Sequence, residues 1–322
     1  MKKEQILLWP TPIQYLEQTV DGQDIFIKRD DLLGFSFGGN KCRIGQAFLK
    51  DMKKKGKDFM ISYGSPSSNL NRTIAALCKS RGIPCLVLVS EEENISSEQK
   101  RQTCESFNSQ IVCSMGIRKV VCKKQQVAQR VEQIVEQVCK EGYHPYYIYG
   151  NQYGTGNEET AREAYRKAYG EIRIWEEMED IFFDSIFLAS GTGMTQGGLL
   201  AGKREMGGQE EIIGISVARE QKAGKAAVRR YAGEGTEEII FDADFRCGGY
   251  GIYDSSIETV IKQMMENHGI ALDPTYTGKA YAGMLKWLEQ YGQTQKKVLF
   301  IHTGGLPLYF DYLNHQRKVE GL

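Results

Sequence analysis

The chain has 322 residues, with 41 lysines and arginines against 41 aspartates and glutamates, so its formal net charge is zero. This balance gives no support to a nucleic-acid partner or another polyanionic partner. No apolar run has the length of a membrane span, and no secretory h-region follows the first residues, so we expect a cytoplasmic protein that makes no contact with a membrane. The eight cysteines include no Cys-x-x-Cys pair and the four histidines are scattered, which argues against a metal site.

Strands and helices alternate along the first half of the chain. Strands are expected at residues 25–30, 59–63, 85–89, 111–113 and 145–149, and helices at residues 44–54, 69–81, 97–108 and 123–140. The strands are short apolar runs, and the last helix has its apolar residues at helical spacing. Such alternation implies a parallel sheet that is covered on both faces. We therefore predict a smaller α/β domain at residues 46–154.

The second half repeats this pattern after a polar, glycine-rich crossing at residues 150–157. Helices are expected at residues 158–169, 195–206, 220–232, 254–268 and 278–291, and strands at residues 183–189, 211–217 and 298–302. Residues 5–20 contain two prolines and are expected to form an extended entry segment. We predict an α/β fold with two parallel-sheet, three-layer domains, in which the smaller domain is inserted into a larger one made of residues 1–45 and 155–322.

Lys41 stands directly after the turn Gly38-Gly39-Asn40. Two adjacent glycines let the backbone take positive φ values and approach a bound group closely. If the lysine is buried there, its ammonium loses solvation and its pKa falls, so the amine can act as a nucleophile or as a base. These are the properties that Schiff-base chemistry requires, although the pattern alone is also typical of a solvated loop lysine.

A second glycine-rich loop follows the strand at residues 183–189 and precedes a helix. Consecutive amides at a helix N-terminus, with hydroxyl groups beside them, are suited to bind a phosphate monoester. A dinucleotide fingerprint would need a third glycine where Gln196 stands and an acidic residue after the next strand, where Ala218 and Arg219 stand. The loop therefore favours a cofactor with a single phosphate over NAD, with a purely structural glycine turn as the alternative.

Five stretches at consistent order and spacing resemble the fold-type-II pyridoxal-phosphate (PLP) enzymes, and among them the family of D-cysteine desulfhydrase and 1-aminocyclopropane-1-carboxylate (ACC) deaminase. The stretches are Gly38-Gly39-Asn40-Lys41, Ser67-Ser68-Asn69 with Arg72, residues 190–198, residues 272–279 and His302-Thr303-Gly304-Gly305. The resemblance covers nearly the whole chain. Its most specific parts are the Asp-Pro-x-Tyr-x-Gly-Lys and His-Thr-Gly-Gly stretches.

The resemblance implies a PLP cofactor that is bound as a Schiff base to Lys41, and it implies no metal. The cofactor's phosphate would be held, largely by backbone amides, at Gly191, Thr192, Gly193, Met194 and Thr195. Asn69 would bind the 3-hydroxyl group, and Thr303 would face the pyridine nitrogen. A neutral hydroxyl group at that nitrogen gives a weaker electron sink than a carboxylate would, which suits β-elimination.

The resemblance also implies roles for residues that meet the substrate. Tyr276 would assist proton transfer together with Lys41, and Ser68 would contact the substrate's carboxylate or its reacting centre. The expected substrate-binding residues are Ser67, Ser68, Asn69, Tyr250 and Tyr276. Capping of the helix that follows is the structural alternative for Ser68 and Asn69. The chain departs from the family pattern at Ser67, where relatives carry glutamine, and at Ile44, where they carry a basic residue.

The function implied by the resemblance is that of a PLP-dependent lyase, which acts on a small amino acid by β-elimination. For D-cysteine the products would be pyruvate, ammonia and sulfide, and we expect a homodimer. The alternatives are a β-replacement synthase and a ring-opening deaminase of the ACC deaminase type, the latter less favoured because Thr277 stands where ACC deaminases carry glutamate. A non-catalytic binding module with the same fold is an alternative of another class.

Overall fold

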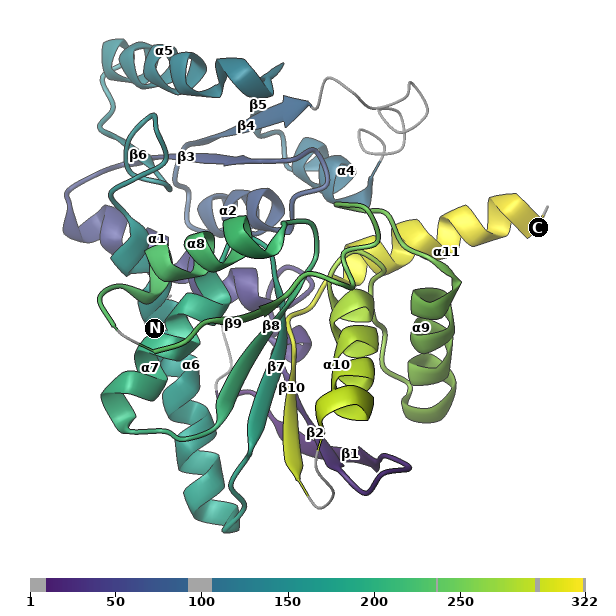
Figure 1. Ribbon diagram of the computed structural model, residues 1–322. Helices are drawn as coiled ribbons and strands as arrows, with labels where there is room; N and C mark the ends of the chain where they lie inside the picture. The colour runs from purple at the N-terminus through teal and green to yellow at the C-terminus, as the bar shows by residue number, and fades with distance from the viewer. Residues whose placement is uncertain (1–9, 92–105, 236, 293–295, 321–322) are drawn as a thin grey trace. The chain divides into compact units, whose positions relative to one another are not determined.

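The computed structural model describes residues 10–91, 106–235, 237–292 and 296–320 (Figure 1). Contacts divide the chain into two units: the larger unit comprises the chain up to Asn40 and from Ala161 onward, and the smaller unit comprises Lys41–Thr160. No helix in the described ranges is long and apolar enough to span a membrane. These units are groups of residues that contact one another, and such groups need not fold independently. The predicted domain boundaries, after residue 45 and before residue 155, therefore stay a prediction.

The larger unit contains a six-stranded sheet with the strand order β1-β2-β10-β7-β8-β9. Its strands are β1 (Ile13–Gln18), β2 (Asp24–Arg29), β7 (Ser185–Ser190), β8 (Glu211–Ser216), β9 (Ile240–Asp242) and β10 (Lys297–His302). Neighbouring strands are parallel, except that β1 pairs antiparallel with β2. The sequence did not predict β9, and it predicted only extended chain where β1 forms. Both strands lie at sheet edges and neither is a continuous buried run, so their sequence pattern is weak.

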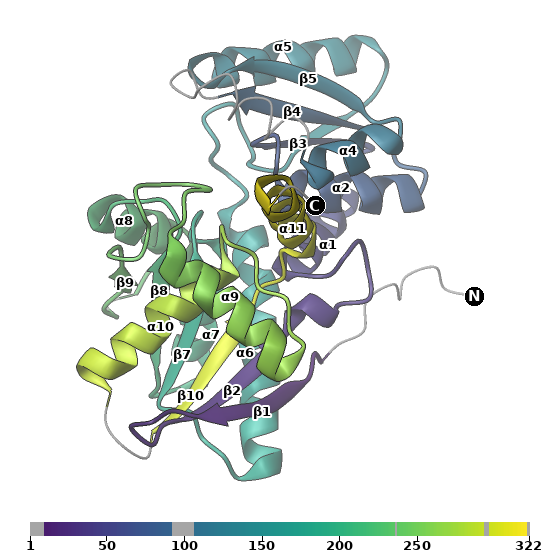
Figure 2. The same ribbon diagram turned by 90° about the vertical axis from the view of Figure 1, so that its right-hand side faces the viewer.

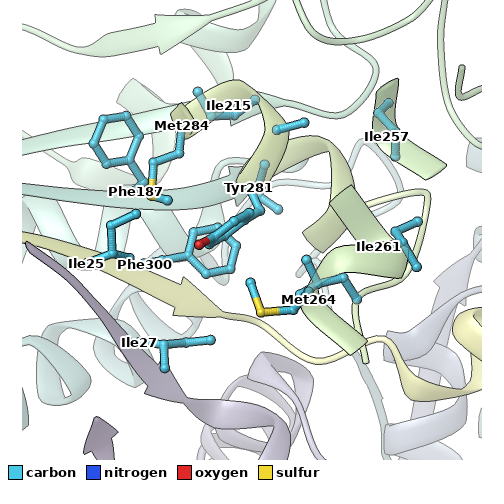
Figure 3. Packing of buried hydrophobic residues seen from close by; sticks show 14 of the residues in the cluster. Ile25, Ile27, Phe187, Ile215, Ile257, Ile261, Met264, Tyr281, Met284 and Phe300 are labelled. Atoms are coloured by element: carbon cyan, nitrogen blue, oxygen red, sulfur yellow. The ribbon is translucent and has the colours of Figure 1, made fainter. Parts of the chain in front are cut away.

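Helices lie on both faces of this sheet (Figures 1 and 2). They are α6 (Glu158–Glu179), α7 (Met194–Met206), α8 (Gln221–Ala232), α9 (Ser255–His268) and α10 (Thr277–Tyr291), whereas α11 (Leu306–Glu320) starts beyond the end of β10. Side chains from α9 and α10, among them Ile261 and Met284, share one buried apolar cluster with Ile27 and Phe300 of the sheet (Figure 3). The sequence did not predict α11. It also ended α6 ten residues early, although the buried Ile172 continues the helix's inner face.

The smaller unit contains a four-stranded parallel sheet with the order β5-β4-β3-β6. Its elements are α1 (Asn40–Lys54), β3 (Phe59–Gly64), α2 (Asn69–Ser80), β4 (Cys85–Glu91), α4 (Phe107–Ser114), β5 (Arg118–Lys123), α5 (Val127–Lys140) and β6 (Pro145–Tyr147). Helix α5 packs on one face, where Ile134 meets Ile61 and Leu88 in one cluster. Helices α2 and α4 pack on the other face, where Ala75 and Val112 share a cluster with β4.

The strand predicted at residues 111–113 is wrong. These residues belong to α4, which begins after Ser106, whose hydroxyl oxygen accepts a hydrogen bond from the Ser109 amide at 3.3 Å. Three apolar residues fit a strand and a helix equally well, and the cap decides for the helix. The strand of this region is instead β5, a charged edge strand. Of the helix predicted at residues 97–108, residues 97–105 lie outside the described part of the chain.

The turn before α1 lies directly against the loop after β10. The Gly39 amide donates to the Asp30 carbonyl at 2.8 Å, and the Asn40 amide donates to the Thr303 carbonyl at 3.0 Å. A Cβ atom on Gly39 would lie 2.8 Å from the Thr303 oxygen, and a Cβ atom on Gly304 would overlap the Cα atom of Gly39. The two backbones therefore come this close only because glycine stands on both sides.

Replacing Gly304 with alanine tests this contact, because Gly304 has a φ of 89° and no room for a methyl group. Gly22, in the β1–β2 turn, is a matched control with a φ of 86° and no atom within 4 Å of the added carbon. Denaturant unfolding should show that Gly304→Ala lowers the free energy of unfolding by about 2–4 kcal/mol, and Gly22→Ala by about 1 kcal/mol. Equal losses in the two variants would contradict the close approach.

Candidate functional site

Lys41 is the second residue of α1 and follows two glycines with φ values of 66° and 96°. Its side chain is partly buried, and this desolvation lowers the pKa of the ammonium to about 8. Within the described part of the chain, no hydrogen bond or ion pair holds its Nζ atom. An amine that is partly desolvated and not engaged by a neighbour is suited to react as a nucleophile.

Two other buried lysines are held by neighbours. Lys28 Nζ forms an ion pair with Glu171 Oε2 at 2.9 Å and donates to the Thr11 carbonyl at 3.3 Å. Lys279 Nζ donates to three backbone carbonyls, which belong to Val217, Arg246 and Gly249, at 3.1, 2.8 and 2.7 Å. An amine that donates to this many acceptors needs its protons and is a poor nucleophile. Among these three lysines, the chemistry of a reactive amine therefore fits Lys41.

The loop at residues 191–195 leads into the N-terminus of α7. Gly193 is the residue before the helix, with a φ of 87°, and as a glycine it has no side chain to cap the first turn. The helix N-terminus therefore offers amide donors to an anion. A Cβ atom on Gly193 would lie 2.6 Å from the backbone of Ala227 in α8, so this glycine is required by helix packing as well as by its backbone conformation.

Asn40 connects this loop to the turn that precedes Lys41. Its side-chain Nδ2 donates to Thr195 Oγ1 at 3.0 Å, and its backbone amide donates to the Thr303 carbonyl. Sequence reasoning placed Asn40 in the motif but assigned it no role. The contact brings together Thr195 and Thr303, both of them predicted cofactor residues. Thr303 is buried after β10, and among the described residues no group hydrogen-bonds its hydroxyl.

Tyr250 and Tyr276 lie together in the larger unit. The Tyr276 hydroxyl donates to the Tyr250 hydroxyl at 3.0 Å, and the two rings meet edge to face with centroids 5.8 Å apart. The family resemblance matched Tyr250 to a second active-site tyrosine, less securely than it matched Tyr276. The pair places two phenol groups next to each other at partly exposed positions, where a hydrogen-bond chain can move a proton.

Asp273 holds the loop that carries Tyr276. Its Oδ1 accepts the amides of Thr275 at 2.9 Å and Tyr276 at 2.8 Å. Its Oδ2 accepts the amide of Thr277 at 3.1 Å and the hydroxyl of Thr277 at 2.9 Å. Burial raises the pKa of this carboxyl group, against the opposing effect of the four hydrogen bonds. Thr277 is fully buried in this network, so its side chain supports the loop.

Lys279 holds the loop that carries Tyr250. Of its three acceptors, the carbonyl of Gly249 directly precedes that tyrosine and the carbonyl of Arg246 lies four residues before it. Lys279 and Tyr276 both lie at the start of α10, so the same helix end supports both tyrosines. Sequence reasoning included Asp273 and Lys279 in the family motif without giving them a role. Their place beside Tyr276 in that motif was the signal that could have identified them.

The smaller unit brings together Ser67, Ser68 and Asn69 at the start of α2. Ser68 is the helix cap, and its Oγ atom accepts the Asn71 amide at 3.2 Å, so the capping alternative is confirmed as a structural role. A buried residue that the sequence did not suggest, Asn108, contacts Ser67 and Asn69. The predicted residues thus form two groups: Lys41 and these serine and asparagine residues in the smaller unit, and the others in the larger unit.

A family model described as pyridoxal-phosphate dependent enzyme matches residues 5–304. A D-cysteine desulfhydrase of Klebsiella pneumoniae subsp. pneumoniae is 32% identical over 95% of this chain and 94% of its own length. The solved structure of an ACC deaminase homologue has a TM-score of 0.81 at 30% identity and covers 97% of this chain and 94% of that chain. O-ureido-L-serine synthase, at 14% identity, shares the fold with a TM-score of 0.65 over 94% of this chain and 90% of its own. These likenesses confirm the predicted α/β fold class.

The free energy of unfolding should depend on pH through the buried amine of Lys279, because desolvation lowers its pKa from 10.5 to about 8. Between these two values the unfolded chain binds a proton that the folded chain does not, so the free energy of unfolding rises with pH in this window. The Lys279→Met variant lacks this contribution, and the lowered pKa of Lys41 acts equally in both proteins. Denaturant unfolding of the two apoproteins should therefore diverge from pH 8 upward. A difference that stays constant with pH would contradict the burial of this amine.

Proposed function

The chain belongs to the family of pyridoxal-phosphate-dependent enzymes, and on this premise we propose that it is a lyase that removes the β-substituent of D-cysteine. The reaction consumes water and yields pyruvate, ammonia and sulfide. Support for this substrate comes from the D-cysteine desulfhydrase relative, which aligns over nearly the whole of both chains. The chain's own site residues agree with a cofactor that has one phosphate and forms a covalent bond to a lysine.

The observation that carries the proposal is the state of Lys41. Its amine is partly buried, its pKa is lowered to about 8, and no neighbour in the described part of the chain engages it. Lys28 and Lys279, by contrast, are held by an ion pair and by three carbonyls. We therefore assign to Lys41 the covalent bond to the cofactor and a part in moving the substrate's α-proton.

The residues that would hold the cofactor match its chemistry. The uncapped start of α7, with residues 191–195, offers amides to a phosphate, and Thr303 offers a hydroxyl group to the pyridine nitrogen. Asn69 would hydrogen-bond the 3-hydroxyl group. When bound, PLP withdraws electrons from the substrate's α-carbon and so acidifies its α-proton. The residues of this chain then have to orient the substrate and to move that proton.

Ser68 is the proposed contact for the substrate's carboxylate. Its Oγ atom already accepts the Asn71 amide, so its hydroxyl hydrogen remains available to donate to an anion. The N-terminus of α2 adds favourable electrostatics for a negative charge at this place. Tyr276, with Tyr250 hydrogen-bonded to it, is the second proposed proton carrier in addition to Lys41.

Ring-opening deamination is a second candidate because of the likeness to the ACC deaminase homologue. The structure of the 273–277 loop weighs against it. Thr277, at the position of the glutamate in ACC deaminases, has no carboxylate to offer a substrate, and its buried hydroxyl donates to Asp273. The expected cytoplasmic location and homodimer remain predictions, for which fractionation and light scattering are the measurements.

Incubation of the holoenzyme with D-cysteine, L-cysteine and ACC tests the proposed function. We expect stoichiometric sulfide and pyruvate from D-cysteine, and loss of this activity in Lys41→Ala because the amine is the attachment point. Release of ammonia and α-ketobutyrate from ACC, without sulfide from either cysteine, would overturn the proposal in favour of the deaminase.

A second experiment identifies the lysine that carries the cofactor. Borohydride reduction of the holoenzyme, followed by peptide mapping, should find the pyridoxyl label on Lys41. A label on Lys28 or on Lys279 would show that the assignment from hydrogen-bond partners is wrong.

The tyrosine pair gives a test of proton transfer. Tyr276→Phe removes one hydroxyl group and should lower kcat on the order of a hundredfold, the usual effect of losing a positioned acid or base. Tyr250→Phe removes only the group that accepts the Tyr276 hydrogen bond and should lower kcat about tenfold or less. Steady-state kinetics with D-cysteine measure both effects, with visible absorbance as the check that the cofactor is retained. Full kcat in Tyr276→Phe would leave Lys41 alone to move the proton.

A further inference from the structure

A buried amide side chain joins α4 to the start of α2 within the smaller unit. Asn108, the second residue of α4, is 1% exposed. Its Nδ2 atom donates to the Ser67 carbonyl at 2.8 Å and to Asn69 Oδ1 at 2.9 Å. One amino group therefore connects the backbone before the cap of α2 with the side chain of the first helical residue.

The chemistry of these partners leaves only one orientation for each amide. A backbone carbonyl can only accept, so the Asn108 atom that faces Ser67 is the amino nitrogen. The second hydrogen of that nitrogen points to Asn69, whose facing atom is then the oxygen. Arg72, a side chain that can only donate, lies 3.5 Å from the same oxygen. The amino group of Asn69 consequently points away from Asn108 and keeps its donors for another partner.

Packing alone does not account for an asparagine at position 108. Its Oδ1 atom is buried and has no hydrogen-bond partner among the described residues. A buried oxygen without a partner costs stability, and an apolar side chain of similar size would avoid that cost. The part of the side chain that makes specific contacts is the amino group, and both of its contacts lie at the segment that carries Asn69.

We propose that Asn108 is a positioning residue that locks the Asn69 amide with its amino group turned toward the cofactor, so that Asn69 donates a hydrogen bond to the cofactor's 3-oxygen. This inference rests on the proposed function, because it takes Asn69 as the contact for that oxygen. An ionised 3-oxygen accepts hydrogen bonds and cannot donate them. An Asn69 amide that is free to rotate presents its oxygen to that group part of the time, and this contact is repulsive.

Titration of the apoprotein with PLP, followed by visible absorbance, measures the effect without any turnover. Asn69→Ala should raise the dissociation constant of the cofactor about tenfold, the order expected for one hydrogen bond to a charged group. Asn108→Ala should raise it several-fold. The double variant should be no weaker than Asn69→Ala, because Asn108 acts only through Asn69. Asn108→Leu, close in size but without an amide, replaces the alanine variant if that variant fails to fold.

Ser106→Ala is the matched control for the stability of α4. It removes the cap of the same helix, and among the described residues the Ser106 hydroxyl forms no hydrogen bond with Ser67 or Asn69. The apoprotein of this variant should melt at a lower temperature, while its dissociation constant for PLP stays that of the unmodified chain. If Ser106→Ala weakens PLP binding as much as Asn108→Ala does, the effect comes from the helix and the inference is wrong.

The remaining outcomes separate this inference from the proposed function. If Asn69→Ala leaves the affinity for PLP unchanged, the assignment of Asn69 under the proposed function fails. If Asn69→Ala weakens binding but Asn108→Ala does not, or if the two effects multiply in the double variant, the positioning role of Asn108 is overturned and the assignment of Asn69 stands.

Discussion

The close approach of two glycine-containing loops determines where α1 begins, and with it the position of Lys41. The Asn40 amide bonds the Thr303 carbonyl, and Gly39 and Gly304 meet with no room for a side chain on either residue. The same turn is held at its other end by the carbonyl of Asp30, a buried residue whose carboxylate accepts hydroxyl groups from helix α6 and from the segment before β1. Lys41 thus follows a turn whose backbone is bonded on both sides.

The distribution of hydrogen-bond partners gives chemically similar side chains different roles. Lys28 is neutralised by Glu171, Lys279 is saturated by three carbonyls, and Lys41 is left with its amine available in the described part of the chain. Burial lowers the pKa of both Lys41 and Lys279 to about 8, so the pKa alone does not separate them. The partners do, because below pH 8 the Lys279 ammonium gives all three of its N–H groups to carbonyls and has no lone pair to offer.

Much of the fold followed from residue order, since apolar runs separated by helical patterns predicted both parallel sheets. The misses have a common cause. Strand β5 is a charged strand at a sheet edge, and α4 contains the short apolar run at residues 111–113. Helix α11 follows the His302-Thr303-Gly304-Gly305 stretch, and no helix was predicted after that stretch. Short or edge elements depend on caps and on packing partners that a local pattern does not contain. Only the likeness to known proteins, over nearly the whole chain, confirmed the family that the five motifs resembled.

The sequence by itself determined features whose parts are neighbours in the chain: a lysine after two glycines, a glycine loop before α7, a serine cap before α2, and the order of strands and helices. The tertiary structure alone decided which side-chain amino groups are engaged by hydrogen-bond acceptors and which remain available to a ligand. The acceptors of Lys279 lie 30 to 62 residues away along the chain, and Asn108 lies 39 residues from the amide that it orients. A side chain's protonation and orientation depend on its burial and on the groups that folding brings to it, and neither exists until the chain has folded.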